Sequence, residues 1–314
     1  MGANEVVRRQ GDGRSMKMVK SIEEYLNQLK AELKDSDAAT VQDALADAEE
    51  HLRVALVALK EKQPETSEEE TLGQVIEQYG LPDEIASAYK DVERLTSPVL
   101  AQEKQRSESL GVRFFAIYAD PRAWGALLYM LVAFVTGIIY FTWAVTGLSL
   151  SVTLSIFIFG LPFLFFFLHS VRSLTLLEGR LVEALLGVRM PRRARFSSQN
   201  VKWLERLKML VTDKYNWKML FYMFCQLPFG TFYFILIVML VSLSLSFMVS
   251  PIIEGFVQQG VVGVIIGDVR YFPPTYLYPL LMIFGFLLLT ASMHLFKWIG
   301  QLHGKYAKMF LVTD

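Results

Sequence analysis

The sequence has a single cysteine, Cys225, and it lies inside an apolar run. One cysteine cannot form an intrachain disulfide, and it cannot build a cysteine-based metal site. The four histidines, His51, His169, His294 and His303, have no metal-ligand spacing. We therefore expect neither a metal centre nor a disulfide-stabilised fold.

Catalytic signatures are absent as well. No nucleophile–base motif, phosphate-binding glycine loop or paired intramembrane carboxylate is found in the chain. The sequence thus predicts a protein that is not an enzyme, with no catalytic residue and no cofactor.

Charge is missing from four long stretches, 125–147, 148–168, 219–249 and 277–296. A helix of about 20 apolar residues crosses a hydrocarbon core of about 30 Å, so each stretch predicts one membrane span. Because these spans lack Asp, Glu, Lys and Arg, we expect no proton- or ion-coupled transporter. Residues 146–149 predict a tight hairpin between the first two spans. The third stretch is too long for one straight span; we expect it to tilt, to kink at Pro228 or to start along the interface, and to end at Pro251.

The charges that remain are unevenly distributed. Residues 20–95 carry 19 Asp and Glu against 8 Lys and Arg, whereas residues 96–314 carry 10 acids against 19 bases. An acidic block that is the wrong sign for nucleic acid therefore precedes a basic, apolar block. Residues 1–20 are polar and basic, so we expect no cleaved signal peptide there, and a disordered tail at 1–19.

Helical periodicity is clear in the acidic block. Apolar residues at helical spacing predict helices at 19–34, at 38–62, up to Tyr79, and at 82–95. Pro64 ends the second helix, Gly80 closes the third, and Pro82 opens the fourth. We expect a small helical bundle over 20–95, followed by a linker at 96–119 that becomes an interfacial helix near Phe114.

Lysines and arginines predict the orientation of the spans. Eleven of them lie in 169–218 and three lie after the last span, whereas the first hairpin has none and 250–276 has only Arg270. The positive-inside rule then places both termini and the 169–218 loop in the cytoplasm, with the chain in the inner membrane.

The membrane block, 120–314, contains an internal repeat. At a constant offset of 93 residues, Asp120 matches Asp213, and the other matches pair Trp124 with Trp217, Tyr129 with Tyr222, Gly137 with Gly230, and Tyr140 with Tyr233. Each copy enters the membrane from the same side, which predicts two repeated hairpins related by an axis along the membrane normal. The predicted fold class is all-α: a helical bundle plus a four-span membrane domain.

The matched residues suggest roles. Trp124 and Trp217 are expected to anchor the helices at the cytoplasmic interface. Gly137 and Gly230 would let helices approach closely. Tyr140 and Tyr233 either pack and form hydrogen bonds or line a ligand pocket at the repeat interface. Pro162 is expected to break the second helix at depth, which can mark a site, although prolines are common in membrane helices.

The segment 172–218 is basic and amphipathic, with Leu174, Leu177, Leu181 and Leu185 on one helical face. Three interpretations stay open for it: contact with anionic lipids, docking of the acidic domain, or topology determination alone. The candidate contact residues are four arginines, Arg189, Arg192, Arg193 and Arg195. The external segment 250–276 has strand propensity at VVGVII, and a cap, a strand pair and an interfacial segment remain open.

Two resemblances follow from these motifs. Residues 20–95 resemble the HTH-associated α-helical signalling domain, through Tyr25, Leu26, Leu29 and Leu33 and the sequences DAEEHL and YGLPDEIA, although Leu81 stands where that family more often has a polar residue. Residues 120–300 resemble the bacterial "Putative sensor" membrane domain, through Trp124, Leu128, Tyr129, Gly137, Tyr140, the sequences GLSL and GLP, the helix 178–187 and Trp217.

The resemblances imply a bacterial membrane sensor or adaptor. It would relay a membrane, lipid or amphiphile signal through the helical domain to a protein partner, such as a PadR-type regulator. The alternatives are a non-catalytic accessory subunit of a membrane complex, such as an ABC-type exporter, and a lipid-binding or transport protein. Neither family supplies catalytic residues, and we expect membrane lipids and proteins as partners and no direct contact with nucleic acid.

Overall fold

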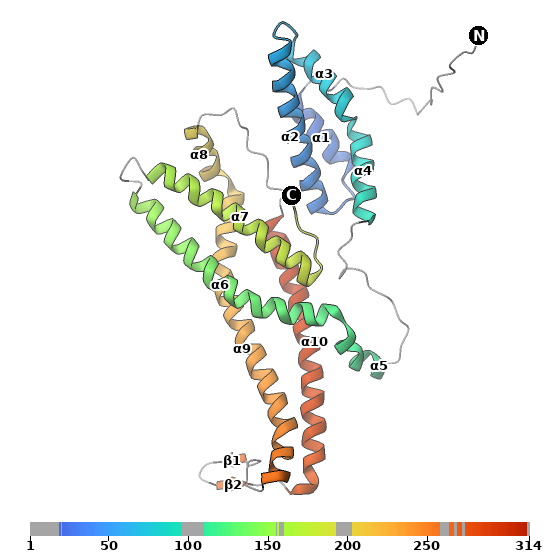
Figure 1. Cartoon of the computed structure of the whole chain (residues 1–314), viewed down its shortest axis with the longest axis vertical. Coiled ribbons are helices and arrows are strands. Elements are labelled where there is room, and N and C mark those ends of the chain that lie inside the picture. The colour runs from blue at the N-terminus through green and yellow to red at the C-terminus, as the bar shows by residue number, and fades with distance from the viewer. Residues whose placement is uncertain are drawn as a thin grey trace, which may run out of the picture.

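The structure, a computed structural model, is an all-α fold of the membrane type (Figure 1). It describes residues 19, 21–95, 110–154, 156, 160–192, 203–257, 264–266, 269–271 and 274–312. Residues 1–18 of the predicted tail and 96–109 of the predicted linker lie outside the described residues. A helical bundle near the N-terminus stands at one end of a group of longer helices (Figure 1).

The N-terminal bundle consists of α1 (Ile22–Glu32), α2 (Ala38–Lys62), α3 (Glu68–Tyr79) and α4 (Pro82–Leu95), which confirms the four predicted helices. Side chains cap three of these helices. Ser21 accepts a hydrogen bond from the Glu24 N–H, Asp37 accepts one from Ala39, and Ser67 accepts one from Glu70. Such caps satisfy first-turn donors that have no partner within the helix, and so they fix where each helix begins.

The bundle is held by an apolar core with one buried tyrosine at its centre. Tyr25 is fully buried among side chains of all four helices, and its hydroxyl donates to the Gly80 carbonyl at 2.9 Å. Gly80 has φ +116°, a conformation that favours glycine and lets the chain turn from α3 into α4. Tyr25 therefore ties α1 to the α3–α4 turn.

A Tyr25→Phe substitution is expected to destabilise this bundle by about 1–2 kcal/mol, because it leaves the Gly80 carbonyl without its donor. Burial, followed by the charges of Tyr79 and Glu84, raises the pKa of Tyr25. The wild-type bundle should therefore lose stability as pH rises above about 10, where an unfolded tyrosine ionises. Hydrogen exchange of α1 measures both effects. If Tyr25→Phe loses as much stability above about pH 10 as the wild type does, ionisation of Tyr25 is not the cause.

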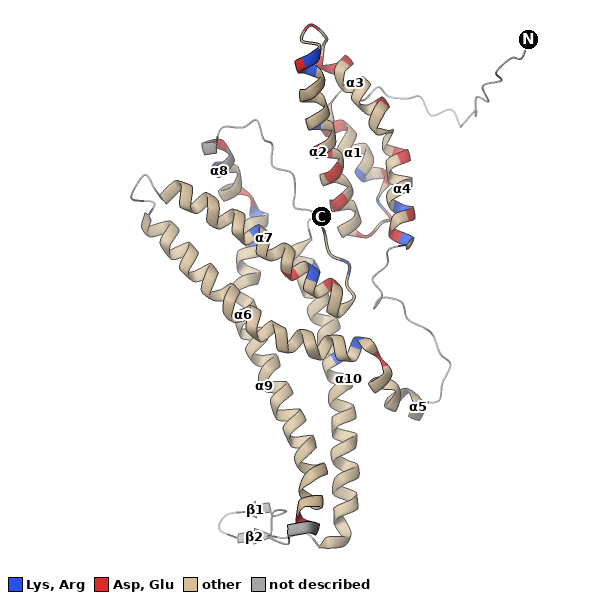
Figure 2. Ribbon diagram, viewed as in Figure 1, with Lys and Arg blue, Asp and Glu red and all other residues tan. Residues whose placement is uncertain are grey.

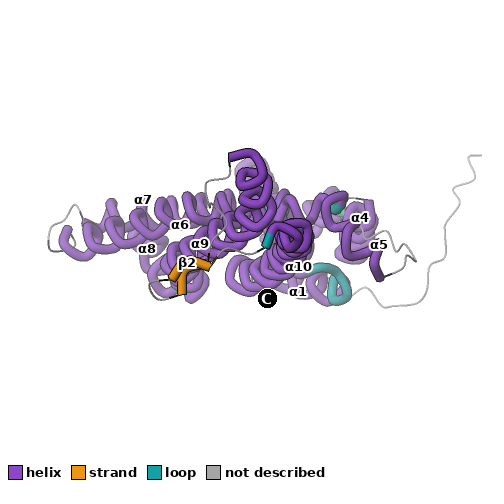
Figure 3. Tube along the Cα trace, turned by 90° about the horizontal axis from the view of Figure 1, so that it is seen from below, coloured by secondary structure: helices purple, strands orange, loops and turns teal. Residues whose placement is uncertain are grey.

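The membrane part contains four helices long and apolar enough to cross a bilayer among the described residues. They are α6 (Pro121–Leu154), α7 (Gly160–Leu186), α9 (Lys214–Val257) and α10 (Tyr278–Leu311), with α5 (Leu110–Phe115) and α8 (Trp203–Thr212) as short helices beside them. The ribbons of the four long helices are almost free of charged residues away from the bundle, except for an acidic residue at the lower end of α9, whereas the short helix α8 carries several charges (Figure 2). Seen from below, α6 and α7 run side by side across the molecule (Figure 3).

Three sequence predictions about these helices were wrong. No hairpin forms at 146–149, because α6 continues to Leu154 and Ser151 bonds its hydroxyl to the Gly147 carbonyl within the helix. Pro162 does not break a helix; it lies in the first turn of α7, where a missing N–H costs nothing. Pro251 does not end the third span, since α9 runs on to Val257 with both Pro228 and Pro251 inside it.

The segment 250–276, which the sequence predicted to be external, contains a short strand pair between α9 and α10. Strand β1 (Val264–Ile266) pairs antiparallel with β2 (Val269–Tyr271), with Ile265 opposite Arg270. This is one of the three arrangements that the sequence left open. The 3-10 turn η3 (Thr275–Leu277) then leads into α10.

Candidate functional site: a buried polar cluster

The centre of the membrane part is a close crossing of α6 and α9. A Cβ atom on Gly137 would lie 2.7 Å from the Gln226 carbonyl oxygen, and one on Gly230 would lie 2.3 Å from the Ala133 carbonyl oxygen. Each glycine therefore faces the backbone of the other helix, so only a missing side chain permits this approach. Gln226 and Ala133 are themselves 93 residues apart, which makes the two contacts counterparts of each other.

Beside this crossing, the carboxyl group of Glu178 is buried among hydrogen-bond donors. Oε1 of Glu178 accepts from the Tyr129 hydroxyl at 2.6 Å, from the Tyr222 hydroxyl at 3.1 Å and from the Gln226 amide at 3.2 Å. These donors come from α6 and α9, whereas Glu178 belongs to α7 and is only 1% exposed. One oxygen atom thus joins three membrane helices.

His303 joins the fourth helix to the same group. Its Nε2 lies 2.6 Å from the Tyr129 hydroxyl and 3.2 Å from that of Tyr222, and its Nδ1 lies 2.9 Å from the Tyr233 hydroxyl. We call these side chains the buried polar cluster: Tyr129, Glu178, Tyr222, Gln226, Tyr233 and His303. Because polar groups buried in a membrane domain are costly unless paired, the cluster favours one arrangement of the four helices.

Three buried polar atoms at the cluster have no hydrogen-bond partner among the described residues: Glu178 Oε2, Gln226 Oε1 and the Tyr140 hydroxyl. Tyr140 interacts electrostatically with the Glu178 carboxyl group, yet the two make no hydrogen bond of normal geometry. Most buried polar atoms in proteins are paired, so three unpaired atoms at one carboxyl group are unusual.

The predicted ligand-binding residues are distributed as follows. Tyr233 belongs to the buried polar cluster, Tyr140 borders it, and Gly137 and Gly230 form the helix crossing next to it. Pro162 is exposed at the start of α7 and takes no part. The sequence did not predict that Tyr140 and Tyr233 would each lie near an ionisable side chain.

The two predicted interface anchors make the same contact. The indole N–H of Trp124 donates to the Tyr118 carbonyl, and that of Trp217 donates to the Val211 carbonyl, six residues earlier in both cases. Both side chains are half exposed. An indole with a satisfied N–H and an exposed apolar face is suited to the membrane interface.

The aspartates that precede these tryptophans also match. Asp120 accepts from the Arg122 N–H and pairs with Lys297 of α10 at 2.8 Å. Partial burial on its own raises the pKa of Asp120, but the hydrogen bonds from Lys297 and the Arg122 N–H and the two nearby positive charges outweigh it and hold the pKa below its usual range. The counterpart Asp213 pairs with Arg172 of α7 at 2.9 Å.

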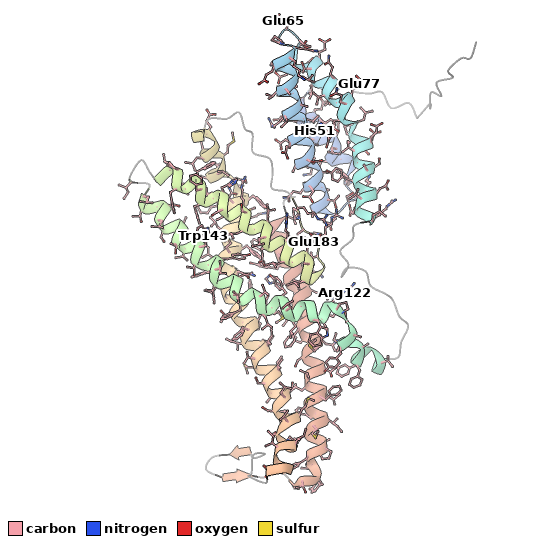
Figure 4. All side chains as sticks on the ribbon, in the orientation of Figure 1. His51, Glu65, Glu77, Arg122, Trp143 and Glu183 are labelled. Atoms are coloured by element: carbon pink, nitrogen blue, oxygen red, sulfur yellow. The ribbon has the colours of Figure 1, made fainter. Side chains whose placement is uncertain are left out.

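The membrane part also contacts the N-terminal bundle. Lys308 of α10 pairs with Asp37, the residue that caps α2, at 2.5 Å. The backbone N–H of Arg192 donates to Asp43 of α2, and the Arg192 guanidinium pairs with Glu183 of α7. Glu183 lies on the part of α7 nearest the bundle (Figure 4).

The four predicted contact arginines differ in their surroundings. Arg192 is exposed and makes the contact with the bundle just described, whereas Arg189 has one buried guanidinium nitrogen without a partner. Arg193 and Arg195 lie outside the described residues. The leucine face predicted for 172–185 is not the one that α7 buries: Leu177 is exposed, and the buried side of the helix carries Val171, Thr175, Glu178 and Val182.

Sequence reasoning missed Glu178 and His303 because both were assigned to cytoplasmic segments. A second alignment would have found them. At an offset of 125 residues, α7 matches α10 in several pairs: His169 with His294, Arg172 with Lys297, Gly179 with Gly304 and Leu186 with Leu311. In this register Glu178 is the counterpart of His303, and Glu183 is the counterpart of Lys308.

The fold and the site define a membrane protein with four long apolar helices and a polar centre. The chain belongs to the family described as "Putative sensor", whose model matches residues 129–311. That range includes every member of the buried polar cluster and ends at the last residue of α10. No curated protein and no solved structure matches the chain. Within the described part of the chain, no group of His, Cys, Asp and Glu side chains could hold a metal ion.

Proposed function

We propose that this protein is a membrane sensor or adaptor that passes a rearrangement of its membrane helices to the N-terminal bundle, and from there to a protein partner. The family assignment supports a sensor role. The observation that carries the relay is that the start of α2 contacts the end of α10 through Asp37 and Lys308. It also contacts Arg192, which lies just after α7 and pairs with Glu183 of that helix.

The relay is short. Lys308 is five residues after His303 on α10, and Glu183 is five residues after Glu178 on α7, which is about 7.5 Å along a helix axis. A change that separates Glu178 from His303 would therefore move both contacts of α2. Ala38 packs against the same apolar cluster as Ala307 and Leu311, so the start of α2 also has apolar contact with the membrane part.

We further propose that the four membrane helices are two copies of one hairpin unit. The matched contacts at offsets of 93 and 125 residues support this arrangement, because Asp120 pairs with the second hairpin and Asp213 pairs with the first. Each hairpin contributes one aspartate to an ion pair with the other, and both contribute to the buried polar cluster. Hairpins connected in this way could change their relative tilt as rigid units.

The charge pattern and the resemblances support a location and a set of partners for the protein. We place the chain in the inner membrane of a bacterium, with both termini in the cytoplasm, and we propose that it is not an enzyme. The bundle would act like an HTH-associated α-helical signalling domain and bind a cytoplasmic or membrane protein, such as a PadR-type regulator. Lipids or amphiphiles between the hairpins would supply the signal.

Hydrogen exchange of the full chain in nanodiscs tests the relay. Tyr233→Phe removes the hydrogen bond between Tyr233 and His303, and both residues lie far from α2 in the sequence. We expect faster exchange in the first turn of α2, by about fivefold, which corresponds to about 1 kcal/mol of lost coupling. In a Lys308→Met background, α2 should already exchange faster, and the added effect of Tyr233→Phe should shrink.

Lys305→Met is the matched control, because Lys305 is exposed on the same helix and no ion pair is found for it among the described residues. That variant should leave exchange in α2 unchanged. If Tyr233→Phe perturbs the membrane helices while α2 exchanges as in the wild type, the relay is wrong.

A further inference from the structure

Glu178 is the only acidic side chain of the buried polar cluster, and no positively charged side chain of the described residues forms an ion pair or hydrogen bond with it. The titratable groups that face it are Tyr129 and Tyr140 from α6, Tyr222 from α9 and His303 from α10. An ionised carboxylate in these surroundings would be a buried charge without a countercharge, which is strongly unfavourable.

The hydrogen bonds of Glu178 are unevenly shared between its two oxygens. Oε1 accepts three hydrogen bonds, whereas Oε2 accepts none although it is fully buried. A carboxylate would present two equivalent acceptors, yet Oε2 accepts nothing, and the nearby Tyr140 hydroxyl makes no hydrogen bond of normal geometry with it. A carboxylic acid presents one carbonyl oxygen that accepts and one hydroxyl that donates, which agrees with three hydrogen bonds accepted by Oε1 and none accepted by Oε2.

The acceptors for such a hydroxyl are present. Gln226 Oε1 and the Tyr140 hydroxyl are the two other unpaired buried atoms at this site, and both can accept a hydrogen bond. A single proton on Glu178 Oε2 therefore removes the buried charge and supplies the missing donor. No other single hydrogen atom satisfies both requirements.

The hydrogen bonds of the neighbouring groups can all be assigned with Glu178 and His303 both neutral. Tyr129 and Tyr222 both donate to Glu178, so at His303 the Nε2 atom must donate to their oxygens. Nδ1 of a neutral imidazole then accepts from Tyr233. The single Nε2 hydrogen is then shared between the Tyr129 and Tyr222 oxygens, at 2.6 and 3.2 Å, and His303 stays neutral.

From this geometry we propose that Glu178 is a proton-binding site of the membrane domain and that it holds its proton on Oε2 in this structure. Loss of that proton leaves a negative charge inside the buried polar cluster, where all four membrane helices meet. Whether Glu178 is protonated therefore determines how firmly the hairpins are held together. The inference depends on the cluster alone and does not require the proposed signalling role.

Infrared spectroscopy of the full chain in nanodiscs, with ¹³C-labelled glutamate, tests the proposal. At neutral pH we expect one carboxylic-acid C=O band that disappears in Glu178→Gln and persists in the matched control Glu183→Gln. Tyr140→Phe or Gln226→Leu should shift this band, because each removes an acceptor of the Oε2 hydroxyl. Since these shifts are read against the wild type, the test remains decisive if Glu178→Gln fails to fold.

Stability provides a second measurement. Between about pH 5 and neutral pH an unfolded glutamate is ionised, so unfolding releases the bound proton, and Glu178 alone raises the unfolding equilibrium constant by about tenfold per pH unit. Glu178→Gln should lose this component and should be at least as stable as the wild type at neutral pH, since glutamine mimics the neutral acid.

Other outcomes would overturn the proposal. A spectrum with carboxylate bands alone would mean that Glu178 is ionised beside an imidazolium. The same spectrum together with a sodium- or potassium-dependent rise in stability, lost in Glu178→Gln, would identify a cation site.

Discussion

Gly230→Ala is expected to unfold the membrane domain or to destabilise it by more than about 3 kcal/mol. The new methyl group would lie 2.3 Å from the Ala133 carbonyl oxygen and 2.8 Å from the Phe134 Cα, both of them backbone atoms that cannot rotate away. Helices α6 and α9 would have to separate, and the hydrogen bonds of the buried polar cluster beside the crossing would lengthen with them. The loss should appear as a lower melting temperature and less monodisperse protein in detergent.

Gly179→Ala is the matched control for this prediction. Its Cβ would meet only the Met190 side chain at 3.4 Å, an ordinary van der Waals distance. Because alanine is favoured over glycine in a helix by about 1 kcal/mol, this variant should be as stable as the wild type or more stable. Equal melting temperatures for the two variants would show that the helices do not cross as closely as described.

The sequence predicted the presence of the membrane helices better than the residues at which they begin and end. Uncharged runs identified four membrane helices, and the match between Asp120 and Asp213 indicated which contacts recur. Helix ends were less predictable, because a run of apolar residues contains no signal that distinguishes a hairpin from a helix that simply continues, as α6 does past Gly147.

The candidate site was predicted only in part. Tyr140 and Tyr233 were recognised from the repeat, but the carboxyl and imidazole groups that face them were not. Glu178 lies between Arg172 and Arg180 in the sequence, so its charge seemed to belong to a cytoplasmic face. Its burial depends on tertiary packing against α6 and α9, which periodicity within one helix cannot show.

Arg172→Met is expected to cost about 2–3 kcal/mol, the second largest effect of a single substitution, because it removes a partly buried ion pair together with a hydrogen bond to Asn216. The guanidinium donates to Asp213 at 2.9 Å and to Asn216 at 2.8 Å, and its side chain is 15% exposed. Methionine keeps the volume and removes both donors, which leaves a partly buried carboxylate without its cation. Arg172→Lys should cost less than Arg172→Met, because an ammonium group keeps the positive charge. It should still cost something, because it can serve only one of the two acceptors well.

The counterpart ion pair supplies the control. Lys297 and Asp120 are about a quarter exposed, so Lys297→Met should cost only about 1 kcal/mol. Adding Asp213→Asn to Arg172→Met should recover part of the stability, since the uncompensated charge is gone, whereas adding Asp120→Asn should not. If Arg172→Met and Lys297→Met prove equally mild in thermal unfolding, α7 is not held to α9 by this ion pair, and the two hairpins are joined through the buried polar cluster and the glycine crossing alone.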